Sequence, residues 1–543
     1  MKKIISFIVL VVFMAACTDK FESMNVNSTR ISLESLEQEF NHIGTVFPSM
    51  IRYLEAEQRF ESLLYESFIG QITTNTDFMG NRNNTTYFIT WNTLWNQIYR
   101  NLMNPTTTIL PKSDAGGYTE FSAKIRLLRV VGLSKLTSFY GPIIYSNFGS
   151  TDNLIYYDSE PEIYDNFFKT LDETMAVFAA NPTFKGFTKF DNTTYEGDIT
   201  KWMKFINSFR IRLAMRIVKV DPDRAELEFN KAVNDPAGLI LENGNNFVAK
   251  LNAKPHIVVV FHDWTDARMG AGYEEVLVGY KDPRIRAWFT EVADEDKAFL
   301  TPGREQGWAY KGVASGSWIK SKNERQIYSN IPAAFNNVRL QRHMTAQEIH
   351  FCLAEAALRG WNTPKTVKEH YEDGIKSSFE DWGVGGVDAY LADSTSMPID
   401  YIDPLDALLE TNEQERKNSY NTRMTDPEAY TIKWIDNVSD EKKLERIMTQ
   451  KWIASFNNSM EMWADHRRTG YPKVHLARKN DSSPQWGVVD NNEPFPFPKR
   501  WPFIDSERLN NKEAVADATA KLGGPDLIST SLWIHPNPGG PNF

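Results

Sequence analysis

Two stretches of the sequence combine flat aromatic rings with polar side chains, a mixture suited to binding sugars. A pyranose offers apolar C–H faces to a stacked ring, and its hydroxyl groups bond to amides, carboxylates and guanidinium groups. The first stretch, residues 77–91, contains Asp77, Arg82, Asn83, Tyr87 and Trp91. The second stretch contains Trp264, Tyr273, Trp308, Tyr310 and Trp318. We predict a ligand-binding surface drawn from both, although Trp91 and Trp318 taken singly also fit core packing.

Residues with the spacing of known catalytic or cofactor sites are missing. The sequence contains no HExxH zinc motif, no Gly-x-Ser-x-Gly turn and no Walker loop, and residues 269–275 lack the third glycine of a dinucleotide fold. The neighbouring acids Glu274 and Glu275, or Asp294 and Glu295, could serve a glycosidase, whose two acids flank one bond. However, 70 acidic residues produce such neighbours by chance. We therefore predict a binding protein and assign no catalytic residue, cofactor or metal ligand.

The amino terminus has the pattern of an export signal. Two lysines precede an apolar run from Ile4 to Met14, and two alanines follow it. The next residue is Cys17, and the pattern resembles the lipobox of bacterial lipoproteins, in which this thiol is acylated and the preceding peptide bond is cut. Residues 1–16 are thus predicted to be a lipoprotein signal peptide, and residues 17–33 the lipidated cysteine and a flexible linker. The alternative is an ordinary signal peptide with an incidental cysteine.

Composition narrows the possible functions. The formal net charge is -10 over 543 residues, and the sequence lacks the clustered Lys and Arg with which proteins neutralise nucleic-acid phosphates. After residue 16 no apolar run approaches the roughly 20 residues of a membrane-spanning helix. With Cys17 lipidated, Cys352 is the only remaining thiol, so no intramolecular disulfide can form. We expect a folded body held at the membrane by its lipid, with no nucleic-acid partner.

Most of the chain repeats apolar residues at helical spacing. Helical stripes are predicted at 55–68, 91–102, 123–139, 163–178 and 202–217. A further pair of helices is predicted within residues 347–383, where Gly360 can end the first helix and Thr363 and Pro364 can start the second. Small residues such as Ala354 and Ala357 allow the close approach seen in tetratricopeptide-type pairs.

Two regions break this pattern. Residues 236–335 are richer in Gly and Pro, and we predict an irregular, loop-rich excursion there with a strand at 256–261, where the sequence is β-branched. The tail from residue 494 is rich in Pro and aromatic residues, which predicts a segment that wraps the surface without regular helix. The predicted fold class is therefore mostly α: a tetratricopeptide-like helical-pair scaffold with an irregular excursion and few short strands.

Motifs along nearly the whole chain resemble, in their order and spacing, the SusD/RagB-type lipoproteins of Bacteroidetes. The residues that carry the resemblance are Asp282, Pro283 and Arg284; Gly312, Val313 and Gly316; Ala354 to Trp361; Gln450, Lys451 and Trp452; Trp463, Asp465 and Arg467 to Pro472; and Ser506, Glu507 and Asn510. The end of the chain departs from the family pattern. Phe503 and Ile504 replace a frequent Tyr-Pro, and Ile534 and His535 replace the final Trp-Asp.

The resemblance implies a helical lipoprotein anchored through Cys17 in the cell outer membrane and facing outside. It implies a SusC-like TonB-dependent barrel as partner, over which the lipoprotein sits as a lid, and an oligosaccharide, or sometimes a peptide, as cargo. It implies no catalysis, and residues 34–543 are expected to form a single SusD-like helical domain. Two other interpretations stay open: a lipid-anchored helical-repeat scaffold that binds only proteins, and an anchored glycoside hydrolase.

One of these motifs is explained by folding rather than by a ligand. Asp465 and Arg468, three residues apart, can pair on one helix with Trp463 beneath them, and Gly470 can end that helix before Pro472. We expect this group to hold the fold together without contacting a ligand.

Overall fold

Helices form most of the structure, as the apolar stripes predict. The computed structural model describes residues 37–54, 57–152, 154–405, 424–536 and 542–543. The predicted signal peptide, Cys17 and the linker lie outside the described residues. The longer helices are α8 (Thr106–Ala115), α9 (Thr119–Tyr140), α10 (Glu160–Ala180), α11 (Ile199–Ile217), α12 (Pro222–Val233), α17 (Ala346–Leu358), α18 (Val367–Asp381), α22 (Asp440–Ala454), α23 (Ser459–Thr469) and α25 (Lys512–Leu522).

Short helices, π-helical turns and short strands fill the segments between them. The short helical elements are η1 (Gln38–Phe40), α4 (Asn41–Gly44), α5 (Phe47–Arg52), η2 (Glu61–Tyr65), α6 (Glu66–Phe68), η3 (Phe78–Asn81), η4 (Asn84–Thr86), α7 (Leu94–Asn96), η5 (Gln97–Met103), η6 (Asn243–Asn245), α13 (His256–Val258), η7 (Val259–Asp263), α14 (Ala271–Tyr273), η8 (Glu274–Val278), α15 (Ile285–Trp288), α16 (Asp294–Leu300), η9 (Ala333–Asn337), α19 (Val387–Ala392), α21 (Pro427–Tyr430) and α24 (Asp505–Asn510). The strands of the described chain are β1 (Ile72–Thr74), β2 (Phe247–Lys250), β3 (Ala267–Met269) and β4 (Leu340–Met344). The mostly helical fold class is therefore confirmed.

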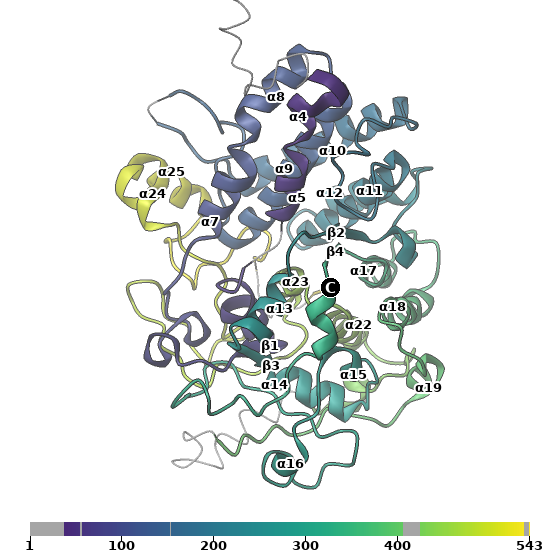
Figure 1. Cartoon of the computed structure of the whole chain (residues 1–543), viewed down its shortest axis with the longest axis vertical. Helices are drawn as coiled ribbons and strands as arrows, with labels where there is room; N and C mark the ends of the chain where they lie inside the picture. Colours follow the sequence, from purple (N-terminus) through teal and green to yellow (C-terminus); the bar gives the residue numbers. More distant parts are fainter. Residues whose placement is uncertain (1–36, 55–56, 153, 406–423, 537–541) are drawn as a thin grey trace, which may run out of the picture.

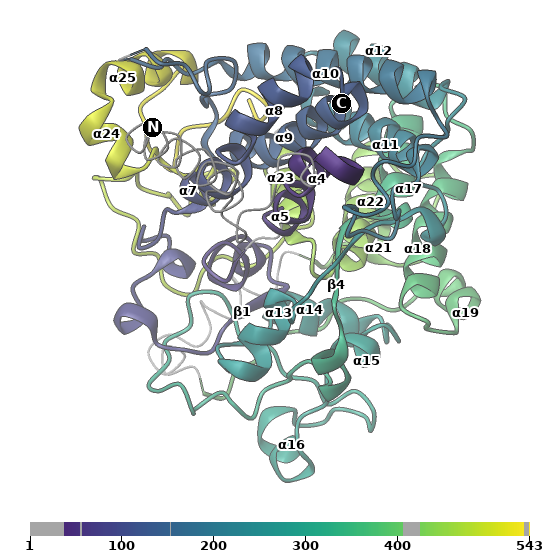
Figure 2. The same cartoon turned by 45° about the horizontal axis from the view of Figure 1, so that its top comes forward.

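The long helices pack in sequential pairs. Helix α9 packs against α10, α11 against α12, and α17 against α18, and the last two pairs follow one another along one side of the molecule (Figures 1 and 2). Gly374 of α18 lies against the ring of Phe351 in α17, so that any added Cβ would come within 2.8 Å of that ring. The second helix of this pair begins at Val367 rather than at Thr363 or Pro364, because Thr366 and Glu369 form a capping box there.

Two short antiparallel ladders tie distant parts of the chain together. Strand β1 pairs with β3, with Ile72 opposite Met269 and Thr74 opposite Ala267. Strand β2 pairs with β4. The first ladder matters most for function, because it brings the start of the aromatic stretch at 77–91 beside the loop-rich excursion.

Two sequence predictions about local structure are wrong. Residues 256–261 are helical, in α13 and η7, and not a strand. Buried apolar residues stand at 257, 258, 260 and 261, a spacing that fits one helix face, so β-branched propensity is overridden by packing. The tail also contains regular helix: no proline occurs between residues 503 and 524, and Ala514, Ala518 and Leu522 form a buried stripe on α25.

The interior contains one extended hydrophobic cluster that reaches from Ile43 to Ile534. Fully buried tryptophans from several segments contribute to it, among them Trp202, Trp288 and Trp463. Several rings of the tail, among them Phe495 and Trp501, are buried as well, whereas Phe543 is exposed. Within the described part of the chain, no helix is both long and apolar enough to cross a membrane.

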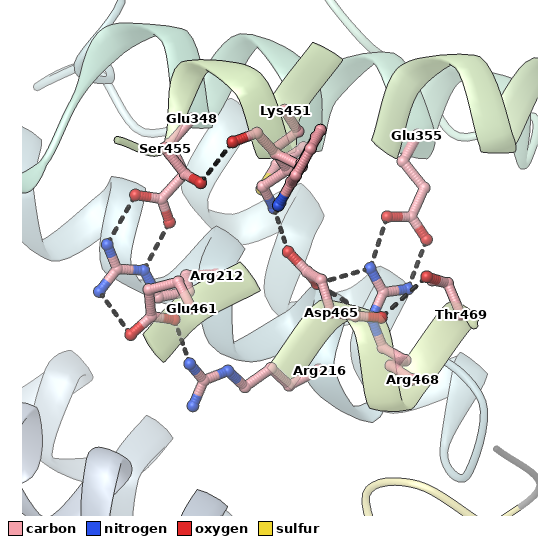
Figure 3. A network of polar contacts seen from close by, with 12 residues as sticks. Arg212, Arg216, Glu348, Glu355, Lys451, Ser455, Glu461, Asp465, Arg468 and Thr469 are labelled. Carbon is pink, nitrogen blue, oxygen red and sulfur yellow. Dashed lines mark hydrogen bonds and ion pairs between the residues drawn. The ribbon is translucent and has the colours of Figure 1, made fainter. Parts of the chain in front are cut away.

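A network of buried charges joins four helices inside this core (Figure 3). Arg212 on α11 bonds to both carboxylate oxygens of Glu348 on α17, at 2.6 and 2.7 Å. Arg212 also pairs with Glu461 on α23 at 3.4 Å, and Glu461 bonds to Arg216. These contacts fix α11 against α17 and α23.

The second half of the network centres on Asp465 and Arg468. Lys451 on α22 donates to Asp465 at 2.7 Å, and Arg468 bonds to Asp465 at 2.9 Å and to the two oxygens of Glu355 at 2.6 and 2.7 Å. The predicted Asp465–Arg468 pair is thus confirmed. Burial alone would raise the pKa of Asp465, but Lys451 and Arg468 outweigh it and hold that pKa well below its ordinary value.

We expect Arg468→Met to destabilise the protein strongly. The substitution leaves Glu355 and Asp465 buried with fewer cationic partners, and breaking such a buried pair costs about 3–5 kcal/mol. Chemical denaturation should show this loss in the free energy of unfolding. The matched control is Arg126→Met, which removes a half-exposed pair with Asp114 and should cost less than about 1 kcal/mol. Equal effects of the two substitutions would contradict the assignment.

Candidate functional site

The β1–β3 ladder places three loop segments on one face of the molecule. The segment after β1 runs through η3 and η4, the second segment is 314–326, and the third is 475–482. Two glycines of the motif at residues 312–316 explain how closely these segments approach their neighbours. A Cβ at Gly312 would lie 2.5 Å from the carbonyl oxygen of Gly270, and Gly316 has a φ of +69° and contacts the backbone of Arg478 and Lys479.

Asn81 joins the first segment to the second. Its side-chain amide donates to the carbonyl oxygen of Ile319 at 2.8 Å, and its carbonyl oxygen accepts from the Ile319 amide at 3.0 Å. Met79, Gly80 and Asn81 all adopt positive φ values of 53 to 65°. A run of left-handed backbone conformations costs free energy for residues other than Gly and Asn. The hydrogen bonds of Asn81 therefore hold this turn in place. As a result, the side chain of Met79 is 68% exposed.

Trp318 lies in the second segment beside this link and is 38% exposed. The ammonium group of Lys479 in the third segment lies 5.7 Å from its ring centroid. Lys479 also pairs with Asp481 at 3.1 Å, and the backbone amide of Asp481 donates to the carbonyl oxygen of Thr86 at 2.7 Å. The three segments therefore support one another around the Trp318 ring.

Trp264 provides a second exposed ring, with 47% of its surface accessible. Lys322 connects it to the second segment, because its ammonium group donates to the Trp264 carbonyl oxygen at 2.5 Å and pairs with Asp266 at 2.7 Å. The hydroxyl group of Thr76 donates to the same carboxylate at 2.7 Å. Connected loops thus carry two indole rings together with positively and negatively charged side chains.

The other residues predicted from the first stretch have mixed positions. Asp77 and Arg82 are exposed, and the Arg82 guanidinium lies 4.0 Å from the centroid of the Phe88 ring. Trp91 is half-buried, with its ring edge-on to Phe78 at 5.8 Å. Asp77, Arg82, Trp91 and Trp264 therefore stay predictions for ligand contact.

Trp308 is also half-buried, and the Arg286 guanidinium lies 4.8 Å from its ring centroid. Its placement leaves one part of the ring accessible. Trp308 likewise stays a prediction.

Three predicted tyrosines lie inside the protein, and we reassign them to packing. The Tyr273 hydroxyl donates to the carbonyl oxygens of Trp452 and Ile453, both at 3.1 Å. The Tyr87 hydroxyl accepts from the Ala477 amide at 3.3 Å. Tyr310 is buried, and burial raises its pKa to about 12. Aromatic residues near a loop surface often turn inward, and sequence spacing does not distinguish the two orientations.

The paired acids do not form a glycosidase arrangement. Glu274 is buried and bonds to Lys311 at 3.0 Å, Arg304 at 2.8 Å and the Gly312 amide at 2.8 Å. Glu275 is buried beside His475, which it contacts directly. Burial, followed by the nearby Glu274, raises the pKa of Glu275 well above its ordinary value. Both acids thus bond inside the fold.

The second acid pair is open to solvent. Asp294 lies at the start of α16 and pairs with Lys297. Among the described residues, no cluster of three or more His, Cys, Asp or Glu side chains is placed to hold a metal ion.

Sequence reasoning missed the residues that connect the site. Asn81 bonds to a residue 238 positions away along the chain, and Lys322 bonds to one 58 positions away. Lys479 contacts an aromatic ring in another loop. Local spacing in the sequence does not indicate contacts of this kind. The only local signal was the Gly-Asn pair at 80 and 81, which is typical of left-handed turns.

We expect Asn81→Gly to loosen the second segment without unfolding the helices. Glycine tolerates the positive φ, so the change removes only the two hydrogen bonds, which leaves the buried Ile319 amide without its partner at a cost of about 1–3 kcal/mol. Hydrogen exchange measured by mass spectrometry should be faster in peptides covering 315–322. The control Asn323→Gly changes an exposed side chain of the same loop and should leave the exchange of Ile319 unaltered. Unchanged exchange in Asn81→Gly would contradict this role.

Comparison with known proteins identifies the family. The family model described as "SusD-like: Susd and RagB outer membrane lipoprotein" matches residues 23–535. A chitin-binding SusD homologue from Flavobacterium johnsoniae is 36% identical, with a TM-score of 0.81, and the match covers 93% of this chain and 100% of that one. A SusD-like protein from Bacteroides thetaiotaomicron is 29% identical, with a TM-score of 0.79 and coverage of 91% and 99%. A SusD homologue from Bacteroides uniformis is 31% identical, with a TM-score of 0.77 and the same coverage.

No curated protein matches the sequence. The family match, however, spans nearly all of the chain, and the solved structures share its whole fold. The resemblance inferred from the sequence motifs is confirmed: the chain belongs to the SusD/RagB family of outer membrane lipoproteins.

Proposed function

We propose that this lipoprotein captures an oligosaccharide at the cell surface and delivers it to a SusC-like TonB-dependent transporter. The observation that carries the proposal is the pair of exposed indole rings, Trp264 and Trp318, held by linked loops that also carry exposed polar groups. Flat rings of this kind stack on sugar faces, and the surrounding lysine, aspartate and arginine side chains can bond to hydroxyl groups.

Similarity to a chitin-binding relative supports the same assignment. That protein is 36% identical and the match covers 100% of it, so this chain shares its fold with a protein described as chitin-binding. A binding role also fits the internal pairing of Glu274 and Glu275, which have bonding partners within the protein. The ligand enters the proposal as a sugar chain with exposed pyranose faces.

We expect Trp264→Ala and Trp318→Ala each to weaken saccharide binding about tenfold or more, the equivalent of about 1.4 kcal/mol. Removal of an indole takes away both the stacking surface and the apolar area that the sugar would cover. Isothermal titration with chitohexaose, and affinity electrophoresis against a glycan panel, measure the effect. The control Phe299→Ala removes an exposed ring from α16, which lies at the bottom of the molecule in Figure 1, and should leave affinity unchanged.

Several results would contradict the proposal. Wild-type protein that binds no glycan or peptide pool and co-purifies with no barrel would overturn it in favour of a protein-binding scaffold. Equal losses in Phe299→Ala would place the site elsewhere. Turnover of a polysaccharide would support an anchored hydrolase instead.

We expect Cys17→Ala to release the protein from the outer membrane fraction. The substitution removes the proposed acylated thiol, while the folded body contains no helix, in its described part, able to span a membrane. Fractionation followed by immunoblotting gives the distribution, and circular dichroism checks that the fold is retained. A variant that stays at the cell surface would show that the partner barrel, and not the lipid, holds the protein.

A further inference from the structure

A polar pocket of about 440 Å³ lies between α5, η5 and α13. This volume is within the range of about 300–1,000 Å³ that is typical of small-molecule sites. Three arginines from separate parts of the chain, Arg52, Arg59 and Arg100, line it together with side-chain amides.

The arginines of this pocket form no ion pair within the described part of the chain. All three arginines are exposed, and among the described residues no carboxylate lies within 4.0 Å of their guanidinium nitrogens. The one acidic residue in the lining is Glu57, which accepts a hydrogen bond from the Thr93 hydroxyl group at 3.5 Å. Among the described residues, three cations therefore share this lining with one carboxylate, in a chain whose formal net charge is -10, and the Glu61 carboxylate lies 3.6 Å from Nδ1 of the lining residue His256.

A second pocket of the same protein provides the contrast. Arg126 also lines a pocket, beside α8, but its guanidinium pairs with Asp114 at 2.7 Å, and Asp114 and Glu173 line the same pocket. The positive charge there is neutralised internally. An arginine that lines a pocket of this protein can thus have an acid partner in the same pocket. The arginines of the first pocket differ from it, because no such partner is present among the described residues.

His256 connects the arginine pocket to the saccharide face. It lines the pocket, and its ring lies edge-on to the exposed ring of Trp264 with centroids 5.7 Å apart. The backbone amide of Gln58 donates to Nε2 of this ring at 3.0 Å, and Nδ1 lies 3.6 Å from the Glu61 carboxylate. These contacts set the orientation of the ring. A ligand stacked on Trp264 would therefore reach the pocket across the imidazole ring.

We propose that Arg52, Arg59 and Arg100 form a subsite for a carboxylate or sulfate group on the saccharide that stacks on Trp264. Guanidinium groups present paired N–H donors that match the oxygens of such groups, and several of them together select an anion over a neutral hydroxyl group. The inference rests on the proposed saccharide binding and specifies its chemical class: an acidic glycan, containing uronic acid or sulfated sugars.

The geometry favours a sugar over the anionic surface of a membrane. The cations lie in a concave pocket whose lining residue His256 contacts the exposed indole of Trp264, whereas a flat lipid surface would be met by basic side chains on a convex or planar face. The overall negative charge of the chain also opposes approach to an anionic bilayer.

Binding of matched neutral and acidic oligosaccharides tests the proposal. Chitohexaose and a hyaluronan oligosaccharide of similar length both contain N-acetylglucosamine, but hyaluronan alternates it with glucuronate; polygalacturonate and chondroitin sulfate oligosaccharides extend the acidic series. We expect the wild-type protein to bind at least one acidic oligosaccharide about tenfold more tightly than chitohexaose at low salt. Arg52→Gln combined with Arg100→Gln should abolish that preference and change chitohexaose affinity less than about twofold.

The control is Arg126→Gln, which removes the same charge from the other pocket and should keep the preference for acidic sugars. Arg52 and Arg100 are exposed and the Arg126 side chain is 40% exposed, so loss of folding is not expected, and thermal unfolding verifies this. Wild-type protein that shows no preference for any acidic oligosaccharide would overturn the subsite while leaving saccharide binding intact. A preference that survives in the double variant would also overturn it.

Two further results separate the alternatives. Binding of neither neutral nor acidic sugars would overturn both the subsite and the proposed function. Lipid-free protein that floats with phosphatidylglycerol vesicles in an Arg52- and Arg100-dependent manner, without any preference among sugars, would assign the pocket to an anionic lipid and overturn the saccharide subsite.

Discussion

The buried charge network between α11, α17, α22 and α23 is the interaction on which the rest of the structure depends (Figure 3). Removing charged groups from water is expensive, so each carboxylate in the network requires its cation at a defined position. Glu348 and Glu355 are seven residues apart on α17, and Glu461, Asp465 and Arg468 occupy one face of α23. Arg212 on α11 bridges Glu348 and Glu461, and Arg468 binds Glu355 directly, so these two contacts, about two helical turns apart along α17, hold α17 and α23 in one register.

This register is transmitted to the ligand face through α22. The side-chain amide of Gln71 donates to the carbonyl oxygen of Trp452 at 2.7 Å and to the hydroxyl group of Ser455 at 2.8 Å. The Trp452 indole in turn donates to the carbonyl oxygen of Ile69 at 2.9 Å. Since Gln71 immediately precedes β1, the charged helices determine where the β1–β3 ladder lies, and the ladder determines where the loops around Trp264 and Asn81 begin.

The repeating parts of this arrangement could be predicted from the sequence, and the non-repeating parts could not. Helices such as α9, α10 and α11 follow from apolar periodicity, and the Asp465–Arg468 pair follows from spacing on one helix. The link between Asn81 and Ile319 joins residues 238 positions apart, and no local pattern encodes it. Likewise, Tyr273 and Trp264 have similar local settings, yet one ring packs in the core and the other is exposed, because each orientation depends on distant neighbours.

The separation between a charged, buried frame and exposed loops also bears on the proposed saccharide specificity. Residues that set the register, such as Arg212 and Arg468, have most of their hydrogen-bonding capacity used inside the core, so they have little freedom to change. The arginines of the pocket, in contrast, have no described acid partner, and substitution there disturbs no internal pair. The proposed specificity for an acidic sugar could therefore change at Arg52 or Arg100 at little cost to folding, whereas the position of Trp264, whose ring contacts the lining residue His256, is kept by contacts the loops share with the frame.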